Sequence, residues 1–306
     1  MDEILVPQHA AGGSPTSRKA LVARMVAAER AVRVTREPQI STPEELLAIA
    51  VRIARQAAAT ARRMRDAAIT DVQTKSTDTD VVTAADKAVE RQVVAALRAE
   101  RPADGVLGEE YGDRTATAAG AVRWILDPID GTVNYLYGLP QYAVSLAAEV
   151  DGAVLAGVVR NAATGDEWTA TRGGGAWRGD RRLTGSARTT LDQTLLATGF
   201  GYDPARRAHQ GAVLAGLITR VRDIRRFGAA SLDLCMAAEG SVDAYFEKGL
   251  NPWDHAAGGL VATEAGLRVS GLDGRAASAE LLIAAPPALF GALHDALADL
   301  DAAGGP

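Results

Sequence analysis

The chain has 306 residues, of which 47% are hydrophobic and 23% charged, so it is neither a disordered nor a fibrous protein. Its formal net charge of −5 argues against direct binding of nucleic acid. Its single cysteine excludes an internal disulfide and fits a reducing compartment such as the cytoplasm. No run of about 18 apolar residues is present, so we expect no membrane span. At roughly 150 residues per domain, the length predicts one large domain or two closely packed halves.

The first strong helix signal follows residues 1–40, which we predict to be a partly disordered N-terminal extension. Thr42 is suited to cap a helix, Pro43 to occupy its first turn and Glu45 to complete a capping box. Apolar side chains then recur at helical spacing, at Leu46, Ile49, Ile53, Ala57 and Met64. This pattern predicts an amphipathic helix.

The next elements are a second helix and a run of strands. Thr83 is expected to cap a helix over residues 84–99, after a polar loop that ends near residue 80. An apolar run over residues 121–126 indicates a buried strand. The dipeptide Asp151-Gly152 then separates two further apolar runs, as is typical of a β-hairpin. The middle of the chain is therefore predicted to be a largely antiparallel sheet.

Helices and strands alternate after about residue 190. We predict helices over 206–219, 229–239, 254–265 and 288–300, and strands over 221–227, 242–247 and 281–285. This order predicts an α+β half over residues 41–190 and an α/β half over residues 191–306, packed together as a layered sandwich.

One acidic segment, Asp127-Pro128-Ile129-Asp130-Gly131-Thr132, follows the predicted strand directly. Asp127 and Asp130 can converge at the strand's end, and the amides that follow them suit an anion such as phosphate. Two carboxylates at close range repel each other unless a cation lies between them, and Mg²⁺ prefers oxygen ligands. Taken alone, this segment is also compatible with an ordinary turn.

Three further segments contribute acids: Gly108-Glu109-Glu110, Asp254 in Trp253–Gly258, and Asp86 in Asp80–Asp86. Each has a simple alternative, since Glu109 suits a solvated turn, Asp254 a helix N-cap and Asp86 an exposed helix face. The presence of all of them in one chain favours a shared site.

Together, in this order, these segments resemble the inositol monophosphatase family over about residues 42–300. The resemblance implies a layered αβαβα sandwich of two intimate halves. It also implies two or three Mg²⁺ ions per subunit, held by Glu109, Asp127, the carbonyl of Ile129, Asp130 and Asp254. Glu109 and Thr132 would orient and deprotonate the attacking water, and Asp86 would hold the Thr132 hydroxyl. Gly131 and Thr132 would bind phosphate through their amides.

The same resemblance implies where the alcohol part of the substrate binds. Its contacts would be Asp130, Glu247, Gly228 and Ala230, and Lys75 matches a loop lysine near the metals, although a solvated lysine explains it as well. The segment Thr198–Tyr202 departs from the family, because Tyr202 lies at or beside a position where relatives place a substrate-contacting serine.

The implied activity is Mg²⁺-dependent hydrolysis of inositol-1-phosphate by an activated water, in a Li⁺-sensitive, cytoplasmic homodimer. Histidinol phosphate, fructose-1,6-bisphosphate or a 3′-phosphonucleotide are alternative substrates within the same superfamily. A regulatory protein that associates with RNA polymerase is the alternative from another class.

Three other features receive plainer interpretations. Cys235 lies among apolar residues and is predicted to be a core residue. The Gly173–Gly175 run lacks the Lys-Ser/Thr of a phosphate-binding P-loop, so we predict a hairpin turn. We predict a solvated or subunit-facing surface for the cluster Arg222, Arg225 and Arg226, with a nucleotide or second-phosphate site as the alternative.

Overall fold

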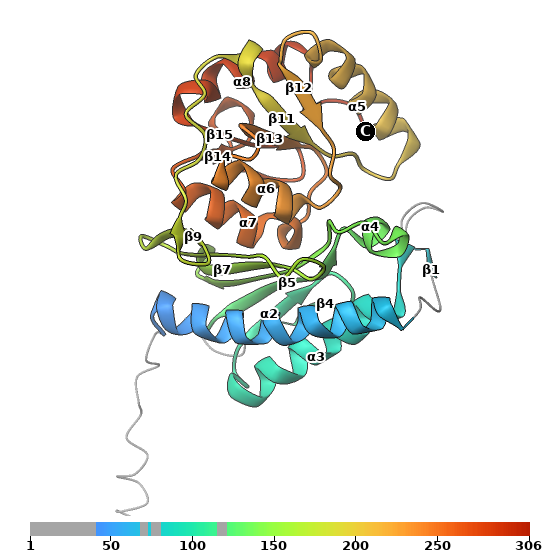
Figure 1. Cartoon of the computed structure of the whole chain (residues 1–306), viewed down its shortest axis with the longest axis vertical. Helices are drawn as coiled ribbons and strands as arrows, with labels where there is room; N and C mark the ends of the chain where they lie inside the picture. Colours follow the sequence, from blue (N-terminus) through green and yellow to red (C-terminus); the bar gives the residue numbers. More distant parts are fainter. Residues whose placement is uncertain (1–40, 68–72, 75–80, 115–120) are drawn as a thin grey trace, which may run out of the picture. The chain divides into compact units, whose positions relative to one another are not determined.

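In the computed structural model, the first two described helices begin at the capping residues that the sequence offers. The structure describes residues 41–67, 73–74, 81–114 and 121–306, which all belong to the unit Ser41–Pro306. Helix α2 (Pro43–Asp66) starts at the capping box of Thr42 and Glu45, as predicted. Helix α3 (Ala84–Glu100) starts at a second capping box, formed by Thr83 and Asp86. These two helices form the first layer of the unit (Figure 1).

The second layer is an eight-stranded sheet of order β10-β9-β8-β7-β6-β5-β3-β4. Neighbouring strands in it are antiparallel except β3 and β5, which run parallel. Its central hairpin turns at Asp151-Gly152 with positive φ angles at both residues, as the sequence predicts. The bounds of its strands are β3 (Gly105–Gly108), β4 (Gly112–Arg114), β5 (Arg123–Asp130), β6 (Ala143–Val150), β7 (Ala153–Asn161), β8 (Glu167–Thr171), β9 (Gly175–Arg178) and β10 (Arg181–Arg182). A separate pair, β1 (Gln73–Thr74) and β2 (Val81–Val82), is antiparallel.

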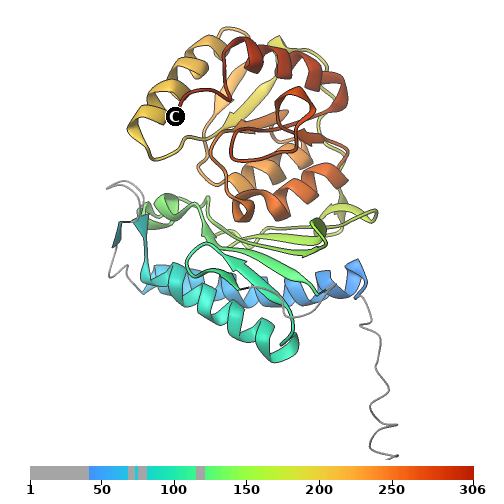
Figure 2. The ribbon, with the colours of Figure 1, turned by 180° about the vertical axis from the view of Figure 1, so that it is seen from behind.

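Three more layers complete the sandwich (Figures 1 and 2). Helices α6 (Ala230–Glu239) and α7 (Pro252–Glu264) cover the face of the large sheet opposite α2 and α3. A five-stranded sheet of order β12-β11-β13-β15-β14 follows, and α5 (Pro204–Leu217) and α8 (Pro287–Asp299) lie on its outer side. Its strands are β11 (Leu195–Thr198), β12 (Asp223–Arg225), β13 (Ala244–Glu247), β14 (Arg268–Ser270) and β15 (Leu282–Ala285). Short 3₁₀ turns cover Leu191–Gln193 and Leu272–Gly274.

The central strands of both sheets are buried on two faces, and their side chains alternate between the cores on either side. Trp124 and Leu126 of β5 enter the core beneath α2 and α3, whereas Ile125 faces α6 and α7. In the same way, Leu196 of β11 packs in the core beneath α5 and α8, whereas Ala197 faces α6 and α7. The prediction of a layered αβαβα sandwich is therefore confirmed.

Two local predictions, at the segment Asp127–Thr132 and at Asp254, need correction. Strand β5 continues through Asp130 instead of ending at Leu126, and its pairing with β6 shifts register between Asp127 and Asp130. Pro128 lies inside this shift, because it has no amide to donate to the ladder. Asp254 is not a helix N-cap: Asn251 caps α7, and Asp254 completes the capping box from the third helical position.

Several other elements were absent from the sequence-based expectation, namely β3, β4, β11 and β14. Each has only three or four residues. In the described part of the chain, no helix is long and apolar enough to cross a membrane.

Candidate active site

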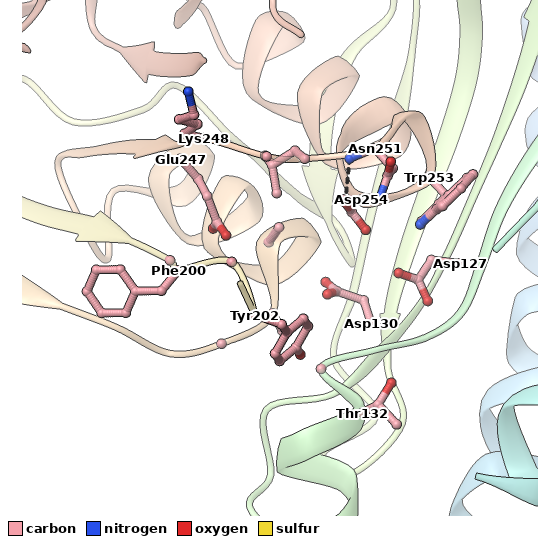
Figure 3. A pocket seen from close by; sticks show the side chains of 18 of the residues that line it. Asp127, Asp130, Thr132, Phe200, Tyr202, Glu247, Lys248, Asn251, Trp253 and Asp254 are labelled. Atoms are coloured by element: carbon pink, nitrogen blue, oxygen red, sulfur yellow. Dashed lines mark hydrogen bonds between the residues drawn. The ribbon is translucent and has the colours of Figure 1, made fainter. Parts of the chain in front are cut away.

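The predicted acids meet at a cavity of about 460 Å³. Asp127 and Asp130 reach it from the end of β5, Asp254 from the first turn of α7, and Glu109 from the residue after β3. In Figure 3 the side chains of Asp127, Asp130 and Asp254 lie close together at one end of the cavity. The cavity thus receives acids from both halves of the sandwich.

Each aspartate is anchored through one carboxylate oxygen. Asp127 Oδ1 accepts the Ile129 amide at 3.0 Å, which closes a tight local turn inside the β5 irregularity. Asp130 Oδ2 accepts the amide and the hydroxyl of Ser231, at 2.8 and 2.5 Å. Asp254 Oδ2 accepts the Asn251 amide at 2.6 Å. An anchored carboxylate still has a second oxygen to offer to a ligand.

A threonine–aspartate pair lies beside these acids. Thr132 opens the short helix α4 (Thr132–Tyr137), and its hydroxyl lies 3.1 Å from Asp86 Oδ1 and 3.1 Å from the Ile129 carbonyl oxygen. The other oxygen of Asp86 accepts the amide of Thr83 at 2.8 Å. Burial raises the pKa of Asp86 to about 6, against the opposing effect of its bonds to Thr83. The predicted pairing of Asp86 with Thr132 is present.

Burial and mutual repulsion dominate the electrostatics of the cluster. Burial, followed by the charges of Glu109, Asp130 and Asp254, raises the pKa of Asp127 well above its usual range. The pKa of Asp254 is raised in the same way, first by burial and then by Asp130. Burial also raises the pKa of Asp130 to about 6, although Ser231 opposes it. Among the described residues, no group of three or more Asp, Glu, His or Cys side chains is already arranged to hold a metal ion.

The loop that carries Glu109 is fixed by a residue that the sequence analysis missed. Glu90 on α3 is buried, and its two carboxylate oxygens accept the amides of Glu110 and Tyr111 at 2.9 and 3.0 Å. Gly108 leaves the space for it, since a Cβ there would lie 2.2 Å from Glu90 Oε1. A signal was available: Glu90 lies one helical turn after Asp86 on the same buried face.

The opposite wall of the cavity holds the residues predicted to contact the alcohol. Glu247 ends β13, and its Oε2 accepts the Tyr245 hydroxyl at 2.6 Å. Burial raises the pKa of Glu247 to about 7. Gly228, Ala230 and Tyr202 line the same cavity. The remaining candidate, Lys75, lies outside the described residues.

Three cations also line the cavity: Arg206, Arg226 and Lys248. The sequence analysis missed Arg206 and Lys248, and considered a ligand site at Arg226 only as an alternative. Arg226 lines the cavity and is exposed to solvent, so the prediction of a solvated side chain holds for it. Its neighbour Arg225 pairs with Asp223 at 2.7 Å outside the cavity.

Residues 301–306 are tied to two of these cations. Lys248 Nζ donates to the carbonyl oxygens of Ala303, Gly304 and Gly305 at 2.7, 2.9 and 3.3 Å. Arg206 Nε donates to the Pro306 oxygen at 3.0 Å. The last residues of the chain thus engage the Lys248 ammonium and the Nε of Arg206.

The glycine run Gly173–Gly175 is a hairpin turn between β8 and β9, as predicted. Its Gly173 and Gly175 amides donate to the two carboxylate oxygens of Glu264 at 2.9 and 3.0 Å. This turn therefore binds a side chain of the protein itself. Cys235 is fully buried, also as predicted.

Carboxylates that converge from a layered α/β sandwich onto a polar cavity define a class of protein suited to phosphate esters and hard cations. Comparison with known proteins is more specific. The chain belongs to the inositol monophosphatase family, whose model matches residues 42–302. This result confirms the family resemblance.

Individual relatives agree with this assignment. The chain is 45% identical over 273 residues to an inositol-1-monophosphatase of Mycobacterium leprae, which covers 83% of this chain and 94% of the relative. It is 39% identical over 230 residues to the Nus factor SuhB of Salmonella typhimurium, covering 75% of this chain and 86% of the relative. The solved structure of Mycobacterium tuberculosis SuhB superimposes with a TM-score of 0.74 at 39% identity, covering 86% of this chain and all of that one.

Proposed function

We propose that this protein is a Mg²⁺-dependent phosphatase of inositol-1-phosphate or a closely similar polyol monophosphate. The observation that carries the proposal is the convergence of Glu109, Asp127, Asp130 and Asp254 on one cavity that also holds Glu247. The names of the mycobacterial relatives support the substrate, and the family supports the reaction class.

The donor set fits a hard divalent cation. Its atoms are carboxylate oxygens and the Ile129 carbonyl, with no thiol or imidazole among the predicted ligands. Burial first, and then repulsion by neighbouring acids, raises the pKa of Asp127 and of Asp254, and a bound cation would oppose both effects by stabilising the charged carboxylates. We therefore propose that Glu109, Asp127, Ile129, Asp130 and Asp254 hold two or three Mg²⁺ ions. When bound, Mg²⁺ would lower the pKa of a nearby water and neutralise charge on the phosphate.

The residues around Thr132 would prepare the nucleophile. Asp86 accepts a hydrogen bond from the Thr132 hydroxyl, so the hydroxyl oxygen keeps lone pairs that can accept a bond from water. Glu109 would take the proton from that water, held in position by the Glu90-anchored loop. The amides of Gly131 and Thr132, which line the cavity, would bind the phosphate oxygens.

The far wall would orient the alcohol. Glu247, Gly228 and Ala230 lie where a polyol attached to the phosphate can reach them, and a carboxylate is a suitable acceptor for hydroxyl protons. No cysteine or serine nucleophile is required, because water attacks the phosphorus in line with the departing alcohol.

A substrate panel tests this function. Purified protein with Mg²⁺ should release phosphate from inositol-1-phosphate faster than from histidinol phosphate or a 3′-phosphonucleotide, and EDTA should abolish the release. If the protein hydrolysed histidinol phosphate alone, the proposed substrate would be wrong, but the proposed reaction, phosphomonoester hydrolysis, would stand. Full activity in EDTA would refute the metal dependence.

We also propose a homodimer that is inhibited by Li⁺, in which residues 41–190 and 191–306 are two halves of one catalytic unit. Sedimentation of the pure protein tests the dimer, and a Li⁺ titration of the phosphatase assay tests the inhibition. A monomer at micromolar concentration would contradict the first part.

A second candidate function is a regulatory role in transcription, because one relative at 39% identity is named a Nus factor. A pull-down with RNA polymerase tests this role. Binding that survives Asp127→Asn would show that it is independent of the phosphatase reaction.

A further inference from the structure

Tyr245 and Glu247 project from the same face of strand β13, because side chains two residues apart on a strand share a face. Phe246, between them, packs in the core beneath α5 and α8, whereas Tyr245 packs in the core on the other side of the sheet. Tyr245 is fully buried there, and Glu247 ends the strand and lines the cavity. A buried phenol therefore lies next to a carboxylate that a ligand can reach.

A short hydrogen bond joins these two side chains. The Tyr245 hydroxyl donates to Glu247 Oε2 at 2.6 Å. Burial, followed by the charges of Glu247 and Asp233, raises the pKa of Tyr245 well above its usual value, so the phenol keeps the proton that it donates. The bond uses one carboxylate oxygen, and a carboxylate has a second oxygen to offer to a ligand.

Gly199 provides the space in which this carboxylate lies. It follows β11 directly, and the parallel pairing of Thr198 with Phe246 brings Gly199 level with Glu247. A Cβ on Gly199 would lie 1.9 Å from Glu247 Oε2 and 2.3 Å from its Cδ. The carboxylate thus occupies the space that the side chain of any other residue would fill, and it is held from two directions.

The hydrogen bond also favours the charged form of Glu247. Burial raises the pKa of Glu247 to about 7, and the bond from Tyr245 is the largest effect that opposes this rise. The charge of Arg226 opposes it as well, whereas Asp130 adds to it. The charged carboxylate accepts hydrogen bonds only, which suits it to the hydroxyl groups of an alcohol.

We propose that Tyr245 is a positioning residue that, together with Gly199, orients the Glu247 carboxylate to accept hydrogen bonds from hydroxyl groups of the substrate's alcohol. This inference rests on the proposed function, since it assumes that a polyol phosphate occupies the cavity. It goes further by assigning selectivity for a hydroxyl-bearing alcohol to a phenol that does not line the cavity.

The test compares inositol-1-phosphate with phenyl phosphate, whose alcohol part carries no further hydroxyl group. We expect Tyr245→Phe to raise KM for inositol-1-phosphate about 3- to 10-fold, with kcat and the phenyl phosphate values changed less than about twofold. Gly199→Ala should produce the same selective loss, because its methyl group displaces the carboxylate.

Tyr135→Phe is the matched control. Tyr135 is also fully buried, and its hydroxyl donates to the Ala61 carbonyl oxygen at 3.1 Å, outside the cavity. This variant loses a buried hydrogen bond of the same kind, so it should leave the ratio of the two substrates' kcat/KM values unchanged.

A double-mutant cycle on inositol-1-phosphate separates positioning from a structural effect. If Tyr245 acts through Glu247, then adding Tyr245→Phe to Glu247→Ala should change KM less than about twofold, because no carboxylate is left to orient. A merely structural role would give the same factor in both backgrounds. If the wild type does not hydrolyse phenyl phosphate, this cycle decides alone.

The outcomes separate this inference from the proposed function. A wild type that hydrolyses inositol-1-phosphate, with equal losses on both substrates, no loss in Tyr245→Phe or independent effects in the cycle, would overturn the role of Tyr245 alone. A wild type inactive on inositol-1-phosphate would overturn the proposed substrate, and this inference with it.

Discussion

The two ends of the cavity are built on different physical principles. At the acidic end, Asp127, Asp130 and Asp254 are each held by an amide of the protein, so carboxylates that repel one another are kept together. At the opposite wall, Arg206 Nε and Lys248 Nζ donate to residues 303–306, whereas Arg226 lines the cavity with no hydrogen bond to any residue that the structure describes. The acidic end is suited to the part of the ligand that all substrates share, the phosphate with its cations. The far wall faces the alcohol, which differs from one substrate to another. Substitutions at the acidic end should therefore affect catalysis more than those at the far wall.

The largest effect is expected from Asp127→Asn. It removes a proposed metal ligand, so phosphatase activity should fall at least about 100-fold. The same change removes a buried charge that repels its neighbours, so the protein in EDTA should become more stable, by about 1–3 kcal/mol. Steady-state kinetics and urea unfolding in EDTA measure the two effects. If stability fell along with activity, the repulsion argument would fail.

A smaller effect is expected from Glu90→Ala, which removes the acceptor of the Glu110 and Tyr111 amides. We expect a loss of about 1–3 kcal/mol in the free energy of unfolding and a tenfold drop in kcat, since the Glu109 loop loses its anchor. Glu90→Gln is the control, because its amide oxygen can still accept one of the two bonds. Activity equal to that of the wild type in Glu90→Ala would show that the loop is held by other contacts.

At the far wall, Lys248→Met should cost about 1 kcal/mol of stability by releasing residues 303–305, while kcat/KM for inositol-1-phosphate changes less than about threefold. Thermal unfolding and kinetics check this together. A catalytic loss as large as that of Asp127→Asn would remove the distinction between the two ends.

The smallest effect concerns pH. Burial raises the pKa of Asp233 well above the ordinary value of 3.8, so the folded protein binds this proton more tightly than the unfolded chain does. The cost of ionising Asp233 therefore grows as pH rises above about 4. Asp233→Asn should be the more stable protein at pH 8, by about 1 kcal/mol, and the advantage should shrink toward pH 4. Urea unfolding at both pH values is the measurement, and an advantage independent of pH would contradict it.

Much of the acidic end could be predicted from the sequence, because its signals are local. Thr42 and Thr83 are recognisable as caps of the helices that follow them. Asp127 and Asp130 are three residues apart at the end of an apolar run. The family resemblance added Glu109 and Asp254, which the fold brings to the same cavity.

The family resemblance also pointed to Glu247, Gly228 and Ala230 of the far wall, but the contacts that hold this wall in place could not be predicted, because they span the chain. Lys248 meets residues 303–305, and Asn134 fixes the loop of Gly228 from almost a hundred residues away. Arg226 follows directly after Arg225, a residue of the same type, so the sequence alone does not say which of the two arginines lines the cavity. The short strands β3 and β14 were missed for a related reason, since three or four residues carry too little periodicity to identify a strand.

The buried Cys235 gives the protein an intrinsic reporter of conformational opening. It is the one cysteine in the chain, is fully buried on α6 and has a pKa raised well above 9.0 by burial. A maleimide can therefore react with it only when the middle layer separates from the sheets. Asp130 is bonded to Ser231 in the first turn of that same helix. The labelling rate would follow how often the layers part, and any ligand that stiffens the acidic end should slow the reaction.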